Sequence, residues 1–238
     1  MPKHSKRYDQ AADSIEHLTF YEPDAAIGLV KDSATARFDE TVELHIRLNV
    51  DPRQADQQVR GVALLPHGLG KTVRILVFAQ GEGERLASES GADFVGSDDL
   101  IERIEGGWTD FDVALATPDI MGRIGRLGRV LGRRGLMPSP RGNTVVQPQD
   151  LPRAIEESRK GRVEFRLDRT GIIHSPIGKA SFEPENLMGN MAALVSAITQ
   201  ARPEVVRGQF IRSISVSSSM GPGVRIDPIA ASTLQPVD

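Results

Sequence analysis

The spacing of apolar residues changes twice along the chain, and this limits the folds that the chain can adopt. In residues 41–50 every second side chain is apolar, a pattern typical of an antiparallel strand with one buried and one solvated face. The same alternation returns in residues 162–167, 171–174 and 210–216. The two ends of the chain therefore favour half-buried, antiparallel sheet structure.

The middle of the chain has a different pattern. Residues 73–78, 92–95 and 111–116 are short, continuous apolar runs, and helical patterns at 82–90 and 98–104 lie between them. Strands that are apolar on both faces and alternate with helices predict a small parallel α/β domain covered on both sides.

Further helical patterns flank these segments. We expect helices at residues 8–18, 23–30, 119–131, 151–160 and 185–201. The glycines at 122, 125 and 128 weaken the third of these helices.

The economical arrangement is a split α+β domain formed by both chain ends and interrupted by an inserted α/β, Rossmann-like domain. We place the first segment at residues 1–67, the inserted domain at 68–160 and the second segment at 161–238. Insertion is physically reasonable because the termini of a domain often lie close together at its surface. The tail after Asp227 is small and polar, and we expect it to be loose.

Composition excludes several classes of protein. The 238 residues contain no cysteine, so disulfides and thiolate sites are absent, and no apolar run approaches membrane-spanning length. The five histidines have no metal-ligand spacing, and no nucleophile motif is present. We therefore expect a cytoplasmic protein with no membrane segment, metal, cofactor or catalytic residue.

The net charge of −3 argues against nucleic acid, but the charge is unevenly distributed. Residues 1–119 carry 12 Lys and Arg against 22 Asp and Glu, whereas residues 120–238 carry 17 against 10. An acidic chain can still present a basic face, because net charge describes the average field and not a site.

Two glycine-containing strings suggest phosphate binding. Residues 66–72, Pro-His-Gly-Leu-Gly-Lys-Thr, resemble a phosphate loop, but Leu65 stands where that motif needs its first glycine. A turn and linker is the better interpretation. Gly81 and Gly83 follow an expected strand and leave open an alternative, a nucleotide-dependent α/β enzyme.

Two other segments suit RNA. Residues 120–149 contain six arginines and no acid, so they could follow phosphates or be a solvated basic face. In residues 213–223, Ser213, Ser215 and Ser217 share one strand face, and an exposed Met220 and a Gly-Pro-Gly turn follow. Such hydroxyls could address the ribose 2′-OH, or the segment could be a serine-rich edge strand.

Seven strings resemble, in order and spacing, the bacterial ribosomal protein L-one family, the stalk proteins of the large subunit. They are residues 37–43, 56–61, 65–71, 131–138, 171–174, 177–180 and 219–223. The resemblance extends from about Lys6 to Asp227.

The resemblance implies a non-catalytic protein with the same split fold. It would bind large-subunit rRNA, form the mobile stalk beside the tRNA exit site and assist release of deacylated tRNA. Members also repress translation of their own mRNA, through the same surface. The resemblance further implies a monomer when the protein is off the ribosome.

The resemblance also implies which residues bind RNA. They are Arg37, Phe38, Thr41, Glu43, Asp168, Arg169, Thr170, Ser213, Ser217, Ser219, Met220 and Gly221. Phe38 offers an apolar face to ribose or base, the arginines reach phosphate, and the hydroxyls address the 2′-OH. Glu43 and Asp168 could accept from a 2′-OH or orient an arginine.

The chain departs from the family pattern at three places. Serines stand at 217–219 where threonine is usual, which keeps the hydroxyls and removes methyl groups. Arg133 replaces a proline, and Arg37 replaces a lysine. These changes make one loop more basic and alter phosphate geometry at the other.

Overall fold

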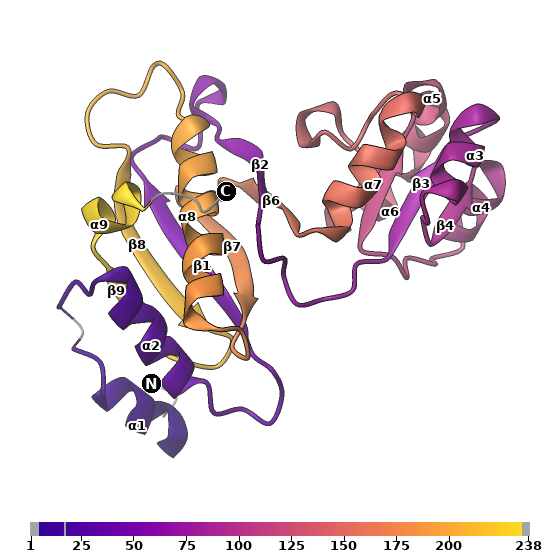
Figure 1. Cartoon of the computed structure of the whole chain (residues 1–238). Helices are drawn as coiled ribbons and strands as arrows, with labels where there is room; N and C mark the ends of the chain where they lie inside the picture. Colours follow the sequence, from indigo (N-terminus) through magenta and orange to yellow (C-terminus); the bar gives the residue numbers. More distant parts are fainter. Residues whose placement is uncertain (1–4, 17, 235–238) are drawn as a thin grey trace. The chain divides into compact units, whose positions relative to one another are not determined.

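The structure is a computed structural model that describes residues 5–16 and 18–234. It contains two compact units: Met1–Gly70 with Val163–Asp238, here the split unit, and Lys71–Arg162, here the inserted unit. Figure 1 shows the chain leaving the split unit, forming the inserted unit and returning. The fold class expected from the sequence is confirmed. The domain boundaries placed from the sequence, at residues 67/68 and 160/161, stay a prediction.

The split unit is built on a four-stranded antiparallel sheet. Its order is β7 (Ile172–Lys179), β1 (Thr41–Leu48), β8 (Ile211–Ser218) and β9 (Val224–Ile226). The even-numbered residues of β1, from Val42 to Leu48, are buried in the core of this unit, as the alternation predicts.

Helices cover one face of this sheet. The helices α2 (Pro23–Ser33), α8 (Pro184–Gln200) and α9 (Pro228–Thr233) all contact its strands, and each begins with a proline, whose fixed φ suits the first helical turn. The side chains of α8 that share the core recur with helical spacing, among them Leu187, Met191 and Leu194. The opposite face of the sheet, here the open face, carries the polar residues of the same strands.

A second, two-stranded sheet joins β2 (Arg60–Leu64) to β6 (Arg162–Arg166). Phe165 of β6 packs so closely over Gly61 that a Cβ at residue 61 would lie 2.6 Å from its ring. Strand β2 was not expected, because residues 51–61 are polar and the strand begins only at Arg60.

The inserted unit contains a parallel sheet in the order β4 (Phe94–Gly96), β3 (Ile75–Phe78), β5 (Val113–Ala116). All four side chains of β3 are buried. Leu76 and Phe78 enter one hydrophobic cluster, whereas Ile75 and Val77 enter the other. The sheet therefore has a core on each face.

Helices form the outer layers of this unit. On one side lie α4 (Asp98–Glu105), α5 (Met121–Ile124) and α6 (Gly128–Arg134); on the other lie α3 (Glu82–Glu89) and α7 (Leu151–Arg159). Short 3-10 helices cover Ala55–Gln57, Pro118–Ile120, Gly125–Leu127, Pro140–Gly142 and Pro148–Asp150.

Three expectations from the sequence are corrected. Helix α1 (Lys6–Asp13) ends at Asp13 and does not reach Leu18. The helix expected at 119–131 is a series of short α and 3-10 turns, consistent with the low helix propensity of its glycines. The tail after Asp227 is not loose up to Thr233, because Asp227 caps α9 and Ala231 is fully buried; residues 235–238 lie outside the described part.

Among residues 5–16 and 18–234, no helix is long and apolar enough to cross a membrane.

Candidate nucleic-acid interface

Strand β1 supplies the centre of the open face. Its odd-numbered residues are Thr41, Glu43, His45 and Arg47, and the last three are the register partners of Ser217, Ser215 and Ser213 on β8. These serines are half-buried, whereas Ile214 and Val216 between them are fully buried. The serine face expected from the sequence is therefore present.

A buried carboxylate organises one end of this face. Glu40 is 1% exposed and precedes β1. Its Oε1 accepts from the Ala36 amide at 2.9 Å, and its Oε2 accepts from the Met220 amide at 2.9 Å and the Ser218 hydroxyl at 2.8 Å. Burial raises the pKa of Glu40, but these hydrogen bonds outweigh it and hold the pKa below its ordinary value. Glu40 therefore ties the loop before β1 to the turn after β8.

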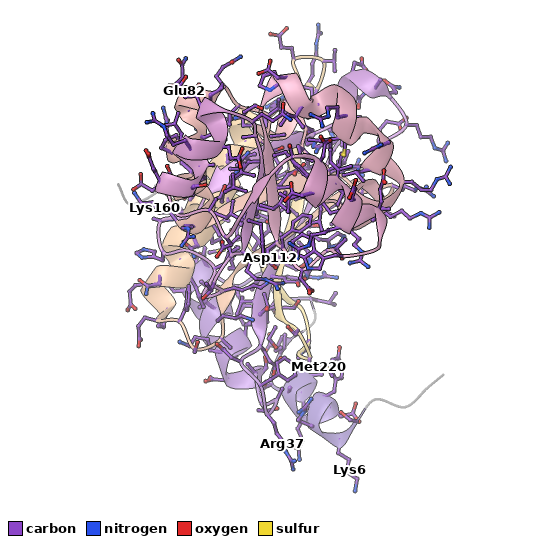
Figure 2. The ribbon with its side chains drawn as sticks, turned by 90° about the vertical axis from the view of Figure 1, so that its right-hand side faces the viewer. Lys6, Arg37, Glu82, Asp112, Lys160 and Met220 are labelled. Carbon is purple, nitrogen blue, oxygen red and sulfur yellow. The ribbon has the colours of Figure 1, made fainter. Side chains whose placement is uncertain are left out.

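These two loops expose apolar side chains. Phe38 is 57% exposed and Met220 is 53% exposed, although both belong to well-anchored segments. Figure 2 shows Arg37 and Met220 at the same end of the split unit. Beside them, the Thr41 amide donates to Ser219 Oγ at 3.0 Å. This end therefore combines rigid backbone with exposed apolar and hydroxyl groups.

The turn after β8 has no room for a side chain at Gly221. A Cβ at this position would lie 2.5 Å from Ser218 Oγ and 3.0 Å from Ser33 Oγ. A side chain here would displace the hydroxyl that donates to Glu40. The glycine therefore preserves the contact between the two loops.

The turn between β6 and β7 is the second organised segment. Asp168 Oδ1 accepts from the amides of Thr170 and Ile172, both at 2.8 Å, and Oδ2 accepts from the Thr170 hydroxyl at 2.6 Å. Despite partial burial, these hydrogen bonds and nearby His174 lower the pKa of Asp168 to about 2. Arg169 is exposed beside them. A shallow pocket of about 370 Å³ adjoins this turn and is lined by Pro52, Gln58, Arg166, Leu167, Asp168 and Arg169.

The structure divides the twelve candidate residues between the two ends of β1 and the strip that joins them. At one end lie Arg37, Phe38, Thr41, Ser219, Met220 and Gly221. At the other end lie Asp168, Arg169, Thr170 and Ser213, since Arg47 pairs with both Ser213 and Ile172. Glu43 and Ser217 lie opposite each other between these ends. At a rise of roughly 3.3 Å per residue, the strip along β1 is about 20 Å long.

Sequence reasoning did not single out the buried supports Glu40 and Ser218, or the pair His45 and His174, as residues of this site, although it placed His45 on the solvated face of its strand. A signal for Glu40 was present: residue 40 has the same parity as buried Val42 and Leu44, so the alternation places its side chain inside. No pattern in one sequence shows that His45 and His174 are register partners.

The glycines of residues 66–72 serve a turn. Gly68 and Gly70 both have a φ of +66°, and a Cβ at Gly70 would lie 2.8 Å from Phe182. Asn190, fully buried on α8, accepts from the His67 amide and donates to the carbonyls of Gly68 and Ile177. The segment is therefore a clamped turn, and Leu65 is buried in the core.

The arginines of the inserted unit are partly engaged. Arg123 forms an ion pair with Asp98, Arg126 pairs with Glu105 at 2.9 Å, and Arg134 donates to Thr109. Arg129 and Arg133 are exposed. Nearby acids therefore neutralise part of the charge of this segment.

In the part of the chain that the structure describes, no group of three or more His, Cys, Asp or Glu side chains is arranged to hold a metal ion.

Comparisons with known proteins agree in one family. Residues 30–222 match the model of the ribosomal protein L1p/L10e family. The chain is 53% identical to large ribosomal subunit protein uL1 of Dehalococcoides mccartyi strain BAV1 over 234 residues, 98% of this chain and 99% of the relative. It is 56% identical to the uL1 protein of Thermomicrobium roseum over 228 residues, 95% of each. It is 54% identical to that of Chloroflexus aggregans over 236 residues, 99% of this chain and 100% of the relative.

Proposed function

The chain belongs to the ribosomal protein L1p/L10e family, and from this premise we propose that it binds large-subunit rRNA through the open face of its split unit. The family makes it a structural constituent of the large ribosomal subunit and not an enzyme. This removes the alternative of a nucleotide-dependent active site. The role of Gly83 is close packing, since a Cβ at this position would lie 3.2 Å from the Cβ of Ala79.

The observation that carries the proposal is the set of three hydrogen bonds that the Glu40 carboxylate accepts. It holds two loops, one bearing Arg37 and Phe38 and the other bearing Ser219 and Met220, at one end of the open face. Exposed apolar side chains on anchored backbone can stack on bases or riboses without first losing conformational freedom. The hydroxyls of Thr41 and Ser219 suit the 2′-OH groups that distinguish RNA from DNA.

The rest of the strip extends the contact. Arg47 and Arg225 lie on the open face, Arg169 lies at the Asp168 turn, and all three are exposed. Arginines at both ends could reach phosphates across a folded RNA, while the serines of β8 face the ribose edge. This local excess of arginine accounts for RNA binding by a chain whose total charge is −3.

On this proposal the protein forms the mobile stalk beside the tRNA exit site. The inserted unit would face exit-site tRNA or additional rRNA and assist release of deacylated tRNA, and its exposed Arg129 and Arg133 are suited to phosphate. The same open face would bind the protein's own mRNA and repress its translation. Off the cytoplasmic ribosome we propose a monomer.

The proposal is tested by titrating the protein with a stalk-region rRNA fragment and with DNA of the same sequence at several salt concentrations. Phe38→Ala and Met220→Ala each remove an exposed apolar contact, and Ile229→Ala on α9 is the matched control, since Ile229 is also exposed. Loss of one stacked side chain should weaken RNA binding by about tenfold, with the salt slope unchanged because no charge is removed. Equal binding of RNA and DNA, unaffected by either variant, would contradict the proposal.

A further inference from the structure

Two histidines meet in the middle of the open face. His45 of β1 and His174 of β7 are register partners, and their Nδ1 atoms are 2.8 Å apart. The rings are tilted by 62°, with centroids 4.9 Å apart. At this distance the two Nδ1 atoms form one hydrogen bond, so one carries the hydrogen and the other a lone pair.

The outer nitrogens of this pair extend the contact in both directions. His45 Nε2 is 3.1 Å from Ser217 Oγ, and His174 Nε2 is 3.7 Å from Asp168 Oδ2. A chain of polar contacts therefore runs from Ser217 through both imidazoles to Asp168, across three strands. It connects the middle of the open face to the Asp168 turn at one end of the proposed RNA surface.

Building on the proposed function, we infer that His45 and His174 form a proton-linked RNA contact, which takes up one proton when RNA binds and connects the middle of the open face to the Asp168 turn. The inference assigns a role to two residues outside the twelve candidates. It predicts that RNA affinity depends on pH through this pair.

The hydrogen bonds of the neutral pair run in one direction. The Ser217 hydroxyl donates to His45 Nε2, His45 Nδ1 donates to His174 Nδ1, and the hydrogen on His174 Nε2 faces the Asp168 carboxylate. The other neutral arrangement would aim a lone pair of His174 at that carboxylate, which is unfavourable.

Uptake of a proton reverses this direction. His174 then carries hydrogens on both nitrogens, its Nδ1 donates to His45, and His45 Nε2 donates to Ser217 Oγ. One proton has been gained and no bond has been lost. The Ser217 hydrogen is now free to be donated to an oxygen of the RNA, and the pair carries a positive charge toward phosphate.

The charged groups near the two histidines explain why RNA binding would favour uptake of a proton. The charged residues of the neighbouring strands and turn are Glu43 and Arg47 of β1, Asp168 and Arg169 of the turn, and Arg225 of β9, whereas Lys179 of β7 lies beside Thr41, farther along the strand. Burial together with His174 lowers the pKa of His45 despite Glu43. The phosphates of a bound RNA would add negative charge beside the two imidazoles and favour uptake of a proton.

The test is the dissociation constant for the stalk-region rRNA fragment from pH 5.5 to pH 8.5 at fixed ionic strength. Uptake of one proton tightens binding by about tenfold for each unit that the pH falls, so we expect up to about a hundredfold between pH 8 and pH 6. The double variant His45→Gln/His174→Gln keeps hydrogen-bonding groups but has no imidazole to take up the proton, so its affinity should change little with pH. His67→Gln, in the loop clamped by Asn190, is the matched control and should keep the wild-type dependence.

Calorimetry in buffers of different ionisation enthalpy counts the protons taken up on binding. We expect about one for wild type and none for the double Gln variant, a difference that a purely structural role would not produce. Wild-type binding without pH dependence, or a double Gln variant that keeps the dependence, would overturn the inference and leave the proposed function intact. If the protein bound RNA no more tightly than DNA at any pH in this range, the proposed function itself would be overturned.

Discussion

At the scale of single residues, Glu40 is the group on which most of the surface depends. Its carboxylate accepts hydrogen bonds from Ala36, Ser218 and Met220, and thereby ties the loop before β1 to the turn after β8. The acceptor cannot be replaced by a group that also donates, because all three partners are donors.

Glu40→Gln should therefore weaken RNA binding without changing its salt dependence. The amide nitrogen would face a donor, so we expect a loss of about 1–3 kcal/mol in unfolding free energy and about tenfold in RNA affinity. Denaturant titration and RNA titration measure the two effects. The exposed Glu204→Gln is the control, and an unchanged affinity in Glu40→Gln would show that the loops need no carboxylate.

Asp168 predicts a stability that depends on pH. Its pKa in the folded chain is about 2, against an ordinary value of 3.8. A carboxyl whose folded pKa is depressed stabilises the fold above its unfolded pKa, and loses this contribution as the pH falls through the folded value. Asp168→Asn should therefore lower the melting temperature at pH 7, and the difference from wild type should shrink between pH 4 and pH 2. A difference that is constant with pH would contradict this.

At the scale of elements, much of the fold could be predicted from the sequence. The alternation of β1 and the serines of β8 fixed which side chains face solvent, and the apolar runs of β3 and β5 indicated a sheet buried on both faces. Strand β2 was missed because it begins at the end of a polar stretch, and β9 was missed because its three residues give no reliable period. Helix α9 was missed because the burial of Ala231 depends on distant residues.

The candidate site was only partly predictable for the same reason. Family strings identify residues such as Phe38 and Met220, but they do not show which side chains hold those residues in place. Glu40, Ser218 and Asn190 act through partners more than 100 residues away, and such pairings are set by tertiary structure.

The clamp on the 66–72 turn yields a prediction at this scale. Asn190→Leu keeps the branched shape of the side chain but leaves the His67 amide and the carbonyls of Gly68 and Ile177 without this partner. We expect a loss of about 2–4 kcal/mol in unfolding free energy, measured by chemical denaturation. Asn186→Leu, on the same helix and partly exposed, should cost far less. Equal losses would mean that the clamp does not stabilise the turn.

At the scale of the whole molecule, the two units have separate cores. The hydrophobic cluster of the split unit shares no residue with the two clusters of the inserted unit. A chain that crosses between the units only twice can lose the inserted unit without breaking the main sheet.

Residues 1–70 joined to 163–238 by a short Gly-Ser linker should therefore fold and bind the stalk-region rRNA fragment within about tenfold of the full chain. Residues 71–162 alone should fold and bind the same fragment far more weakly. Circular dichroism checks folding, and RNA titration checks binding. If the inserted unit proved the tighter binder, the rRNA contact would have to be assigned to its arginines.

The most direct test of rRNA binding by the open face is the methyl resonance of Met220, followed by NMR as the rRNA fragment is added. Met220 is exposed at the proposed surface, whereas Met191 is fully buried on α8 and reports on the fold alone. The account predicts a large, saturable shift of the Met220 methyl with RNA, none with the matching DNA, and little change at Met191. Saturation of the protein with RNA while the Met220 resonance stays in place would contradict it.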